Sequence, residues 1–340
     1  MTRPTRGLGF DRFSGVYLLG LFIVVFSIWQ PALFATTATL HSVAAERAIS
    51  GLMALAILVP LVAGVYDLSV GATVNLTTII AVQLLNDGQS IAVAVLLSVL
   101  VGTGIGLVNG FVVVKLKVNS FITTLGMASI IASFQIIVTD NQQPLAPNLP
   151  PWDSLTQTTV FGFQIVVLYL FVLAALVWWA LACTPAGRYL YAIGSSPDAA
   201  RLSGVRVDRY SWFSLIASGT LAGVAGVLYA SLSGPSLSFG GGLLLPAFAA
   251  VFLGSTQITP GRFNVWGTVL AIYVLATGVK GLQLVTDVQW LDTMFSGVAL
   301  ITAVAVAVGR QRSTEERTRR RTTTTAEPPA EVRTPDSVQV

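Results

Sequence analysis

The chain has 340 residues, of which 54% are hydrophobic and only 10% are charged, and its mean hydropathy is +0.77. Soluble globular proteins carry about 25% charged residues, so this composition excludes that class and predicts an integral membrane protein. One cysteine, Cys183, excludes an intrachain disulfide, and one histidine, His41, leaves no His/Cys cluster for a metal site.

Long windows without Asp, Glu, Lys or Arg mark the membrane-spanning segments, each of which needs about 20 mostly apolar residues. These windows cover residues 13–45, 48–66, 68–86, 88–114, 118–139, 154–187, 210–261, 263–279 and 293–309. The window 210–261 is too long for one helix and is interrupted at Gly234-Pro235, so we expect it to hold two. We therefore predict an all-α membrane protein with about ten transmembrane helices, near residues 15–34, 48–65, 68–85, 91–114, 121–139, 163–183, 211–231, 243–259, 264–281 and 290–309.

The basic residues predict the orientation of these helices. If the N-terminus is inside and the helices alternate, all 19 lysines and arginines lie inside except Arg47 and Lys280. Cytoplasmic loops of membrane proteins carry such an excess of Lys and Arg. We therefore expect a multi-pass protein of the plasma (inner) membrane with both termini cytoplasmic. The net charge of +4 then reflects topology and does not indicate a nucleic-acid partner.

Three regions follow from this pattern. Residues 1–12 form a basic cytoplasmic lead, residues 13–309 form the membrane domain, and residues 310–340, rich in Arg, Thr, Glu and Pro, form a disordered cytoplasmic tail. On the outside we expect a loop at 35–47, helical in part, and an irregular proline-rich loop at 140–162.

The interval 184–210 is the only long polar stretch between apolar spans that carries several basic residues. Pro185 suits a first helical position, and Gly194 is predicted to end that short helix in a left-handed cap. Ser196-Pro197-Asp198 predicts the start of a second short helix, which Gly204 ends. Two interpretations remain: an amphipathic hairpin lying on the membrane surface, or a docking element for a cytoplasmic partner.

Five polar residues within or beside the spans are candidates for a translocation path: Asp67, Ser69, Asn75, Thr78 and Asn109. Asp67 can cap the helix that follows it, with Ser69 beside it, or can form part of a gate. Asn75 and Thr78 share a helical face and either line a path or bond neighbouring backbone. Asn109 needs partners if it is buried, on a neighbouring helix or in a wet pathway.

Glycines and the order of the spans indicate how the helices pack. Gly102, Gly106 and Gly110 recur at four-residue spacing, which favours close approach of another helix. A short, glycine-bounded segment precedes a longer one in both halves, at 68–85 and at 243–259. Spans two to five and seven to ten are thus a candidate inverted repeat, which would place a pathway at the interface of its halves.

Three segments in chain order resemble a known family. They are Gly64-Val65-Tyr66-Asp67-Leu68-Ser69-Val70-Gly71, then Gly106–Gly110 with Phe121–Gly126, and Thr184–Tyr210. Together they resemble permeases of ATP-binding-cassette (ABC) importers of the monosaccharide branch, the ribose, xylose and arabinose type. The resemblance covers roughly residues 15–309. The chain departs from the family pattern at Leu243–Pro246, where polar residues are usual.

The resemblance implies that 13–309 is a permease domain and that 184–210 is its ATPase-coupling loop. By position in the matched motif, the coupling residues would be Arg188, Gly194, Asp198, Ala199, Ala200, Arg201 and Gly204. The implied partners are an ABC ATPase subunit, an external substrate-binding protein, a second permease copy, the lipid bilayer and a sugar or similar small solute. ATP and Mg²⁺ would bind to the ATPase, and no cofactor to this chain.

The residues themselves offer no catalytic constellation. The sequence contains no Gly-x-x-x-x-Gly-Lys-Ser/Thr loop to hold phosphates, so the chain cannot hydrolyse ATP by that route, and we do not expect an enzyme. The spans also lack the buried Asp/Glu/His relay of a proton-coupled carrier. A self-contained secondary transporter or channel for a small polar solute remains the alternative to an ATP-driven permease.

Overall fold

The computed structural model describes residues 10–286, 288, 290–291, 293–306 and 309. The chain folds mainly into helices: α1 Phe10–Trp29, α2 Thr37–Val62, α3 Val70–Asn86, α4 Ile91–Gly110, the π-helix η1 Phe111–Lys115, α5 Ser120–Thr139, α6 Pro150–Gln157, α7 Ile165–Cys183, α8 Pro185–Ser195, α9 Pro197–Leu202, α10 Val207–Ser233, α11 Phe239–Gly254, α12 Val265–Thr286 and Thr293–Val306. Two short antiparallel strands, β1 Thr159–Val160 and β2 Phe163–Gln164, precede α7. The predicted disordered tail, 310–340, and most of the predicted lead, 1–12, lie outside the described residues.

Six of the helices are long and apolar enough to cross a membrane: α2, α4 with η1, α5, α7, α10 and α12. Four shorter apolar helices accompany them: Phe13–Trp29, Val70–Asn86, Phe239–Gly254 and Thr293–Val306. The predicted class, an all-α membrane protein, is confirmed. The prediction of ten spans requires all four shorter helices to cross as well.

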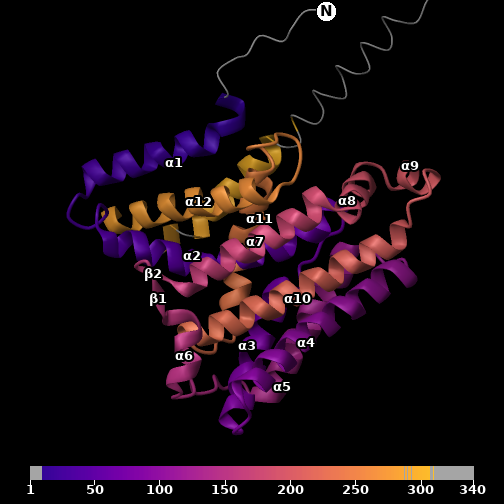
Figure 1. Ribbon diagram of the computed structural model, residues 1–340, viewed down its shortest axis with the longest axis horizontal. Helices are drawn as coiled ribbons and strands as arrows, with labels where there is room; N and C mark the ends of the chain where they lie inside the picture. The colour runs from indigo at the N-terminus through magenta and orange to yellow at the C-terminus, as the bar shows by residue number, and fades with distance from the viewer. Residues whose placement is uncertain (1–9, 287, 289, 292, 307–308, 310–340) are drawn as a thin grey trace, which may run out of the picture.

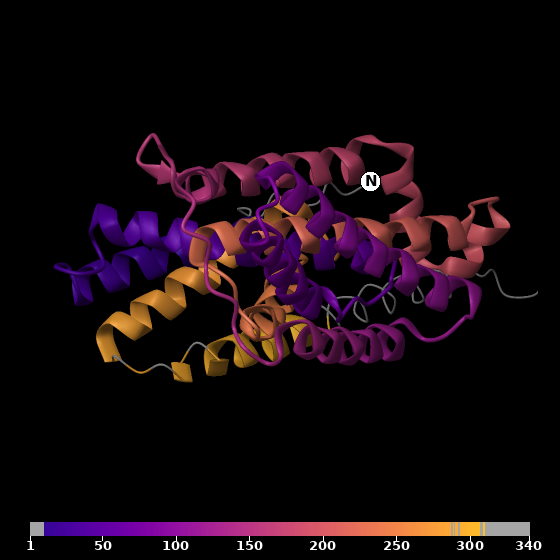
Figure 2. The ribbon, with the colours of Figure 1, turned by 90° about the horizontal axis from the view of Figure 1, so that it is seen from below.

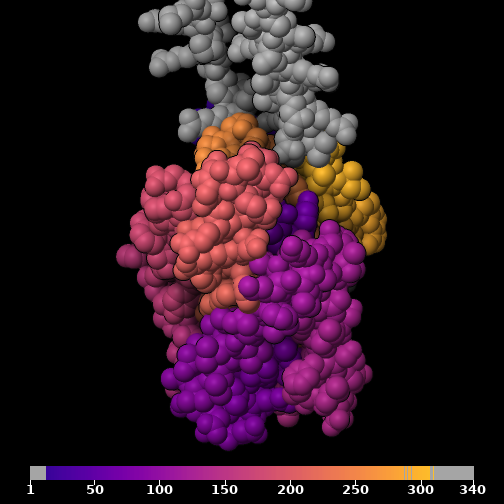
Figure 3. Space-filling view, turned by 90° about the vertical axis from the view of Figure 1, so that its right-hand side faces the viewer, coloured from indigo at the N-terminus to yellow at the C-terminus, as the bar shows by residue number. Residues whose placement is uncertain are grey.

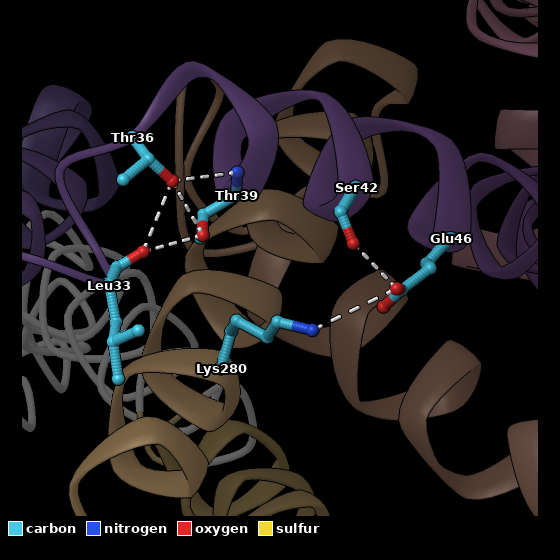
Figure 4. A network of polar contacts seen from close by, with 6 residues as sticks. All are labelled: Leu33, Thr36, Thr39, Ser42, Glu46 and Lys280. Carbon is cyan, nitrogen blue, oxygen red and sulfur yellow. Dashed lines mark hydrogen bonds and ion pairs between the residues drawn. The ribbon is translucent and has the colours of Figure 1, made fainter.

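The bounds of one helix differ from the prediction because a charged residue lies inside it. The second span begins at Thr37 rather than at residue 48, and Thr36 caps it by accepting a hydrogen bond from the Thr39 backbone N–H at 3.1 Å. Its charged residue Glu46 accepts a hydrogen bond from Ser42 at 2.7 Å and lies 3.8 Å from Lys280 of α12, as Figure 4 shows. Glu46 interrupts the charge-free windows in the sequence. The helix nevertheless continues through this residue, because its carboxylate is paired.

One further segment is more regular than predicted, and another is shifted toward the N-terminus. The proline-rich stretch 140–162, expected to be irregular, contains α6 and β1. The eighth predicted span, 243–259, is helix α11 and begins four residues earlier, so Pro246 lies inside the helix instead of at its start.

Helix α2 lies at the centre of the protein. Every residue from Ala48 to Ala63 is buried, and α2 packs against α7, α10, α11 and α12 (Figure 1). Helices α4, α5 and α7 instead lie at the periphery and expose apolar side chains such as Leu100, Ile137 and Leu176. In Figure 2 the long helices lie roughly along one direction. The exposed apolar side chains of α4, α5 and α7 suit contact with lipid.

Most basic residues in the described part of the chain lie at one end of this bundle, which we call the basic end. It comprises η1, α8, α9 and the connection between α11 and α12. Lys115 and Arg201 line one cavity there, and the Arg262 guanidinium lies 3.5 Å from the centre of the Tyr191 ring in α8. Figure 3 views the molecule from this side, with residues 185–215 in pink and salmon. The opposite end carries α6, the β1–β2 hairpin and the Glu46–Lys280 pair.

Candidate functional site

The first two sequence motifs, distant along the chain, meet around the connection between α2 and α3. The Tyr66 backbone N–H donates to the Ser120 hydroxyl at 3.1 Å, and the Leu68 N–H donates to Thr124 at 3.0 Å. The Asn109 amide donates to the Ser69 hydroxyl at 2.9 Å. Residues of α4 and α5 therefore satisfy backbone and side-chain polar groups in a segment that has left the helical conformation.

Asp67 lies at the centre of this cluster and is 1% exposed. One carboxylate oxygen, Oδ1, accepts hydrogen bonds from both the Ser69 backbone N–H, at 3.0 Å, and the Ser69 hydroxyl, at 2.6 Å. The prediction that Asp67 is the N-cap of the third span is wrong by two positions, because Ser69 occupies the N-cap of α3. Asp67 closes the turn that leads into the helix.

The same cluster contains two buried polar atoms without hydrogen-bond partners among the described residues. They are Oδ1 of Asn109 and the hydroxyl of Ser218 on α10. The Ser218 hydroxyl faces the Asp67 carboxylate. Buried polar groups without partners are costly, so these two atoms are candidates for contact with a polar solute.

Asn75 holds the start of α11 in place. Its amide donates to the Leu237 carbonyl at 3.1 Å, and its oxygen accepts from the Gly240 N–H at 2.7 Å. Gln135 of α5 donates to the same Leu237 carbonyl at 2.8 Å. Both polar atoms of Asn75 are thus engaged by the segment that leads into α11.

The Thr78 hydroxyl is likewise engaged by backbone, since it bonds the carbonyls of Val74, at 2.8 Å, and Gly226, at 3.1 Å. These contacts join α3 to α10. They match the interpretation in which a membrane threonine bonds neighbouring backbone.

The three glycines of α4 lie against α10. A Cβ at Gly102 would meet the Gly219 carbonyl oxygen at 2.5 Å, and one at Gly106 would overlap the Leu215 carbonyl oxygen. At Gly110 the space for a Cβ is filled by the indole of Trp212. Only residues without a side chain allow this close approach of the two backbones.

At the basic end, α8 and α9 form the paired short helices expected from their prolines. Thr184 and Ser196 each cap a helix, accepting hydrogen bonds from the N–H groups of Gly187, at 3.3 Å, and Ala199, at 3.4 Å. Gly204 follows α9 with a φ of 82°, in the left-handed region. The capping residues and the prolines that follow them therefore determine where α8 and α9 begin.

The predicted left-handed cap at Gly194 is wrong, because α8 continues to Ser195. Gly194 is needed for a different reason: a Cβ there would overlap the Val62 carbonyl oxygen at the end of α2. Similarly, a Cβ at Gly187 would overlap the Leu181 backbone of α7. The paired helices thus rest directly on the ends of two spans.

The remaining coupling candidates divide between a buried and an exposed face. Ala200 is 5% exposed, while Arg188, Asp198, Ala199 and Arg201 are exposed, and Arg201 lies 3.8 Å from Asp198 and 3.5 Å from Asp208. Sequence reasoning missed Leu202, which ends α9 and is 91% exposed. Its position in the helix was the available signal. Leu202 lies two residues after Ala200, which is about 200° around the helix, so it points away from the protein when Ala200 faces inward.

Tyr191 fastens α8 to the connection between α11 and α12. Its hydroxyl donates to the Phe263 carbonyl at 2.6 Å, and Arg262 stacks on its ring. Burial raises the pKa of the Tyr191 phenol above its ordinary value, and the neighbouring Arg262 charge acts in the opposite direction. The phenol therefore stays protonated and remains a hydrogen-bond donor at neutral pH.

Two highly exposed apolar side chains lie at the opposite end. Phe161, at the tip of the β1–β2 hairpin, is 99% exposed, and Leu145 is 84% exposed. Large exposed apolar side chains at a loop tip are candidates for a protein interface.

Comparison with known proteins identifies the family. Residues 39–304 match the family described as "Branched-chain amino acid transport system / permease component". A ribose import permease protein of Haemophilus influenzae is 28% identical over 289 residues, which cover 84% of this chain and 89% of the relative. A fructose import permease protein of Rhizobium meliloti is 31% identical over 302 residues, 85% of this chain and 83% of the relative.

An autoinducer 2 import system permease protein of Photorhabdus laumondii is 32% identical over 260 residues, 74% of this chain and 75% of the relative. The comparison with solved structures gave no match. The names of these relatives cover several solutes under one family description.

Proposed function

The chain belongs to the family of branched-chain amino acid transport system permease components, and from that premise we propose that it imports a monosaccharide or similar small polar solute. It is a multi-pass inner-membrane permease component of an ABC importer, so it works with an ATPase subunit and a substrate-binding protein. The substrate class rests on the names of the ribose and fructose import permeases among its relatives.

The observation that carries the coupling mechanism is the seating of α8 and α9. Leu202 and Asp198 project from the basic end, while Gly194 contacts the end of α2 and Gly187 contacts the end of α7. In our proposal the ATPase binds the projecting face and pushes on α8 and α9. At Gly194 and Gly187 the backbone of α8 contacts α2 and α7 with no side chain between them. A displacement of α8 is therefore transmitted directly to these two helices.

The cluster around Asp67 lies next along this route. The connection that follows the end of α2 contains Asp67, and its polar groups are held by α4 and α5. We propose that displacement of α2 rearranges this segment and opens the path on the basic side. Neutral polar groups such as Asn109 and Ser218 would interact weakly with a neutral sugar, so specificity would reside in the binding protein.

The two ends of the protein receive different partners in this proposal. The basic end, with η1, α8 and α9, faces the cytoplasm, in agreement with the positive-inside rule, and both termini lie on that side. The binding protein docks at the opposite end, where Leu145 and Phe161 are exposed. A second copy of the permease completes the path, as the resemblance to importer permeases implies.

We propose ten spans arranged as an inverted repeat, and the contacts between helices support the repeat. Helix α3 packs against α4 and α10, while its proposed counterpart α11 packs against α12 and α2. Under inversion, α4 corresponds to α12 and α10 to α2, so the two sets of neighbours match. The two short helices also meet near their N-termini, where Asn75 bonds Gly240. We propose that the path follows this interface.

Affinity purification with the cognate ATPase tests the coupling proposal. Replacing the exposed apolar side chain at the tip of α9, Leu202→Ser, is expected to reduce ATPase recovery at least about tenfold, a loss of roughly 1.4 kcal/mol. Leu145→Ser makes the same change at a similarly exposed leucine of the opposite end and should leave recovery unchanged. If no ATPase accompanies the wild-type protein, the importer proposal fails and a self-contained carrier takes its place.

A further inference from the structure

A groove of about 720 Å³ opens at the basic end between α10 and the α4–η1 segment. Two contacts hold the Trp212 side chain in the wall of the groove. The Trp212 indole N–H donates to the Leu107 carbonyl at 3.1 Å, and the Trp212 ring centre lies 6.4 Å from that of Phe111. Arg201 of α9 reaches its rim, but the other lining residues belong neither to the Asp67 cluster nor to the projecting tip of α9. The proposed import function assigns no role to it.

The inner part of the groove is apolar. Its lining there consists of Leu107, Val114, Val207, Trp212, Phe213 and Ile216. Leu107 and Phe213 are about half exposed, and both lie on helices long and apolar enough to cross a membrane. From Arg209 at its rim to Ile216 the groove follows α10 for about 10 Å at 1.5 Å per residue. One bilayer leaflet contributes about 15 Å of hydrocarbon.

The rim of the groove is basic. It carries Lys115, Arg201, Arg206 and Arg209, with one acid, Asp208. Arg201 lies 3.5 Å from Asp208, whereas Lys115, Arg206 and Arg209 form no ion pair with a carboxylate in the part of the chain that the structure describes. The π-helix η1 ends at Lys115 and so determines where this side chain meets the rim. The rim therefore retains an excess of positive charge.

We propose that this groove binds an anionic phospholipid of the cytoplasmic leaflet. One acyl chain lies along the apolar wall of α10 and α4, and the phosphate group contacts Lys115, Arg206 and Arg209. Basic pockets between membrane helices on the cytoplasmic side suit anionic headgroups. A lipid fits better than a protein segment because the apolar lining extends about 10 Å below the basic rim, along two helices that are long and apolar enough to cross a membrane.

A bound lipid would join η1 to the start of α10, directly beneath the coupling segment. The inference rests on the proposed orientation of the basic end, but not on which solute is imported. Its test measures lipid retention, which does not depend on transport or on the ATPase.

The test is native mass spectrometry of the detergent-purified protein with phosphatidylglycerol or phosphatidylcholine of identical acyl chains. The wild-type protein should retain phosphatidylglycerol in preference. Lys115→Gln/Arg209→Gln removes two rim charges and should weaken that retention about 10- to 30-fold, with little change for phosphatidylcholine. The control Arg188→Gln/Lys280→Gln removes one arginine and one lysine that line neither this groove nor the cavity beside it.

A second readout protects the test against loss of structure. Phosphatidylglycerol should raise the unfolding midpoint of the wild type and of the control, and should raise that of the rim variant much less. Equal retention of both lipids, or undiminished phosphatidylglycerol binding by the rim variant, would overturn the proposal. Loss of ATPase binding by the rim variant with lipid retention intact would instead assign the groove to the protein interface.

Discussion

Gly106 shows how a missing side chain determines helix packing. The backbone of α10 occupies the position of its Cβ, whereas a Cβ at Gly104, two residues away, would meet nothing within 4 Å. We predict that Gly106→Ala destabilises the protein by about 1–3 kcal/mol, because α4 and α10 must separate. Gly104→Ala should be neutral or slightly stabilising, since alanine favours helix. Thermal unfolding in detergent measures both, and equal midpoints would contradict the proposed close packing.

Asp67 shows how one carboxylate oxygen serves two donors. Asp67→Leu leaves the buried Ser69 N–H and hydroxyl without their acceptor, which should cost about 2–4 kcal/mol. Asp67→Asn keeps an oxygen at the same position and should retain most of the stability. Chemical or thermal unfolding of the two variants distinguishes these expectations. Equal losses would show that the negative charge, and not the acceptor geometry, stabilises the connection between α2 and α3.

The residue types at the site could be predicted from the sequence, but their partners could not. Asn75 and Asn109 stand out as amides within apolar segments, because such groups need hydrogen bonds. Yet the partner of Asn75 is a backbone amide 165 residues away, and Asn109 contacts a hydroxyl 40 residues earlier. Spacing within one helix contains no information on contacts between distant segments.

At the scale of elements, the sequence around each helix terminus predicted the first residue of a short helix better than its last residue. The Thr-Pro and Ser-Pro pairs correctly predicted where α8 and α9 begin, because capping involves only neighbouring residues. The end of α8 was mispredicted since Gly194 serves packing against α2, a tertiary contact. The partial helix expected at 35–47 was not joined to the second span for a similar reason, since Glu46 within α2 pairs with Lys280 of a distant helix.

At the scale of the whole molecule, the clustering of basic residues predicts one orientation. Replacing Cys183 by serine gives a background without cysteine, into which Ser203→Cys at the basic end or Asn148→Cys at the opposite end can be introduced. A membrane-impermeant maleimide applied to intact cells should label position 148 and not position 203. After permeabilisation both should react. Labelling of position 203 in intact cells would invert the proposed topology.

The central claim is that this permease moves solute only when a separate ATPase drives it. The decisive measurement is uptake of radiolabelled ribose or fructose into proteoliposomes that contain the permease, with the cognate ATPase and binding protein present or omitted. We predict uptake with all components and ATP, and none from the permease alone. Uptake by the permease alone, unchanged by ATP and by Leu202→Ser, would contradict the account and identify a self-contained carrier.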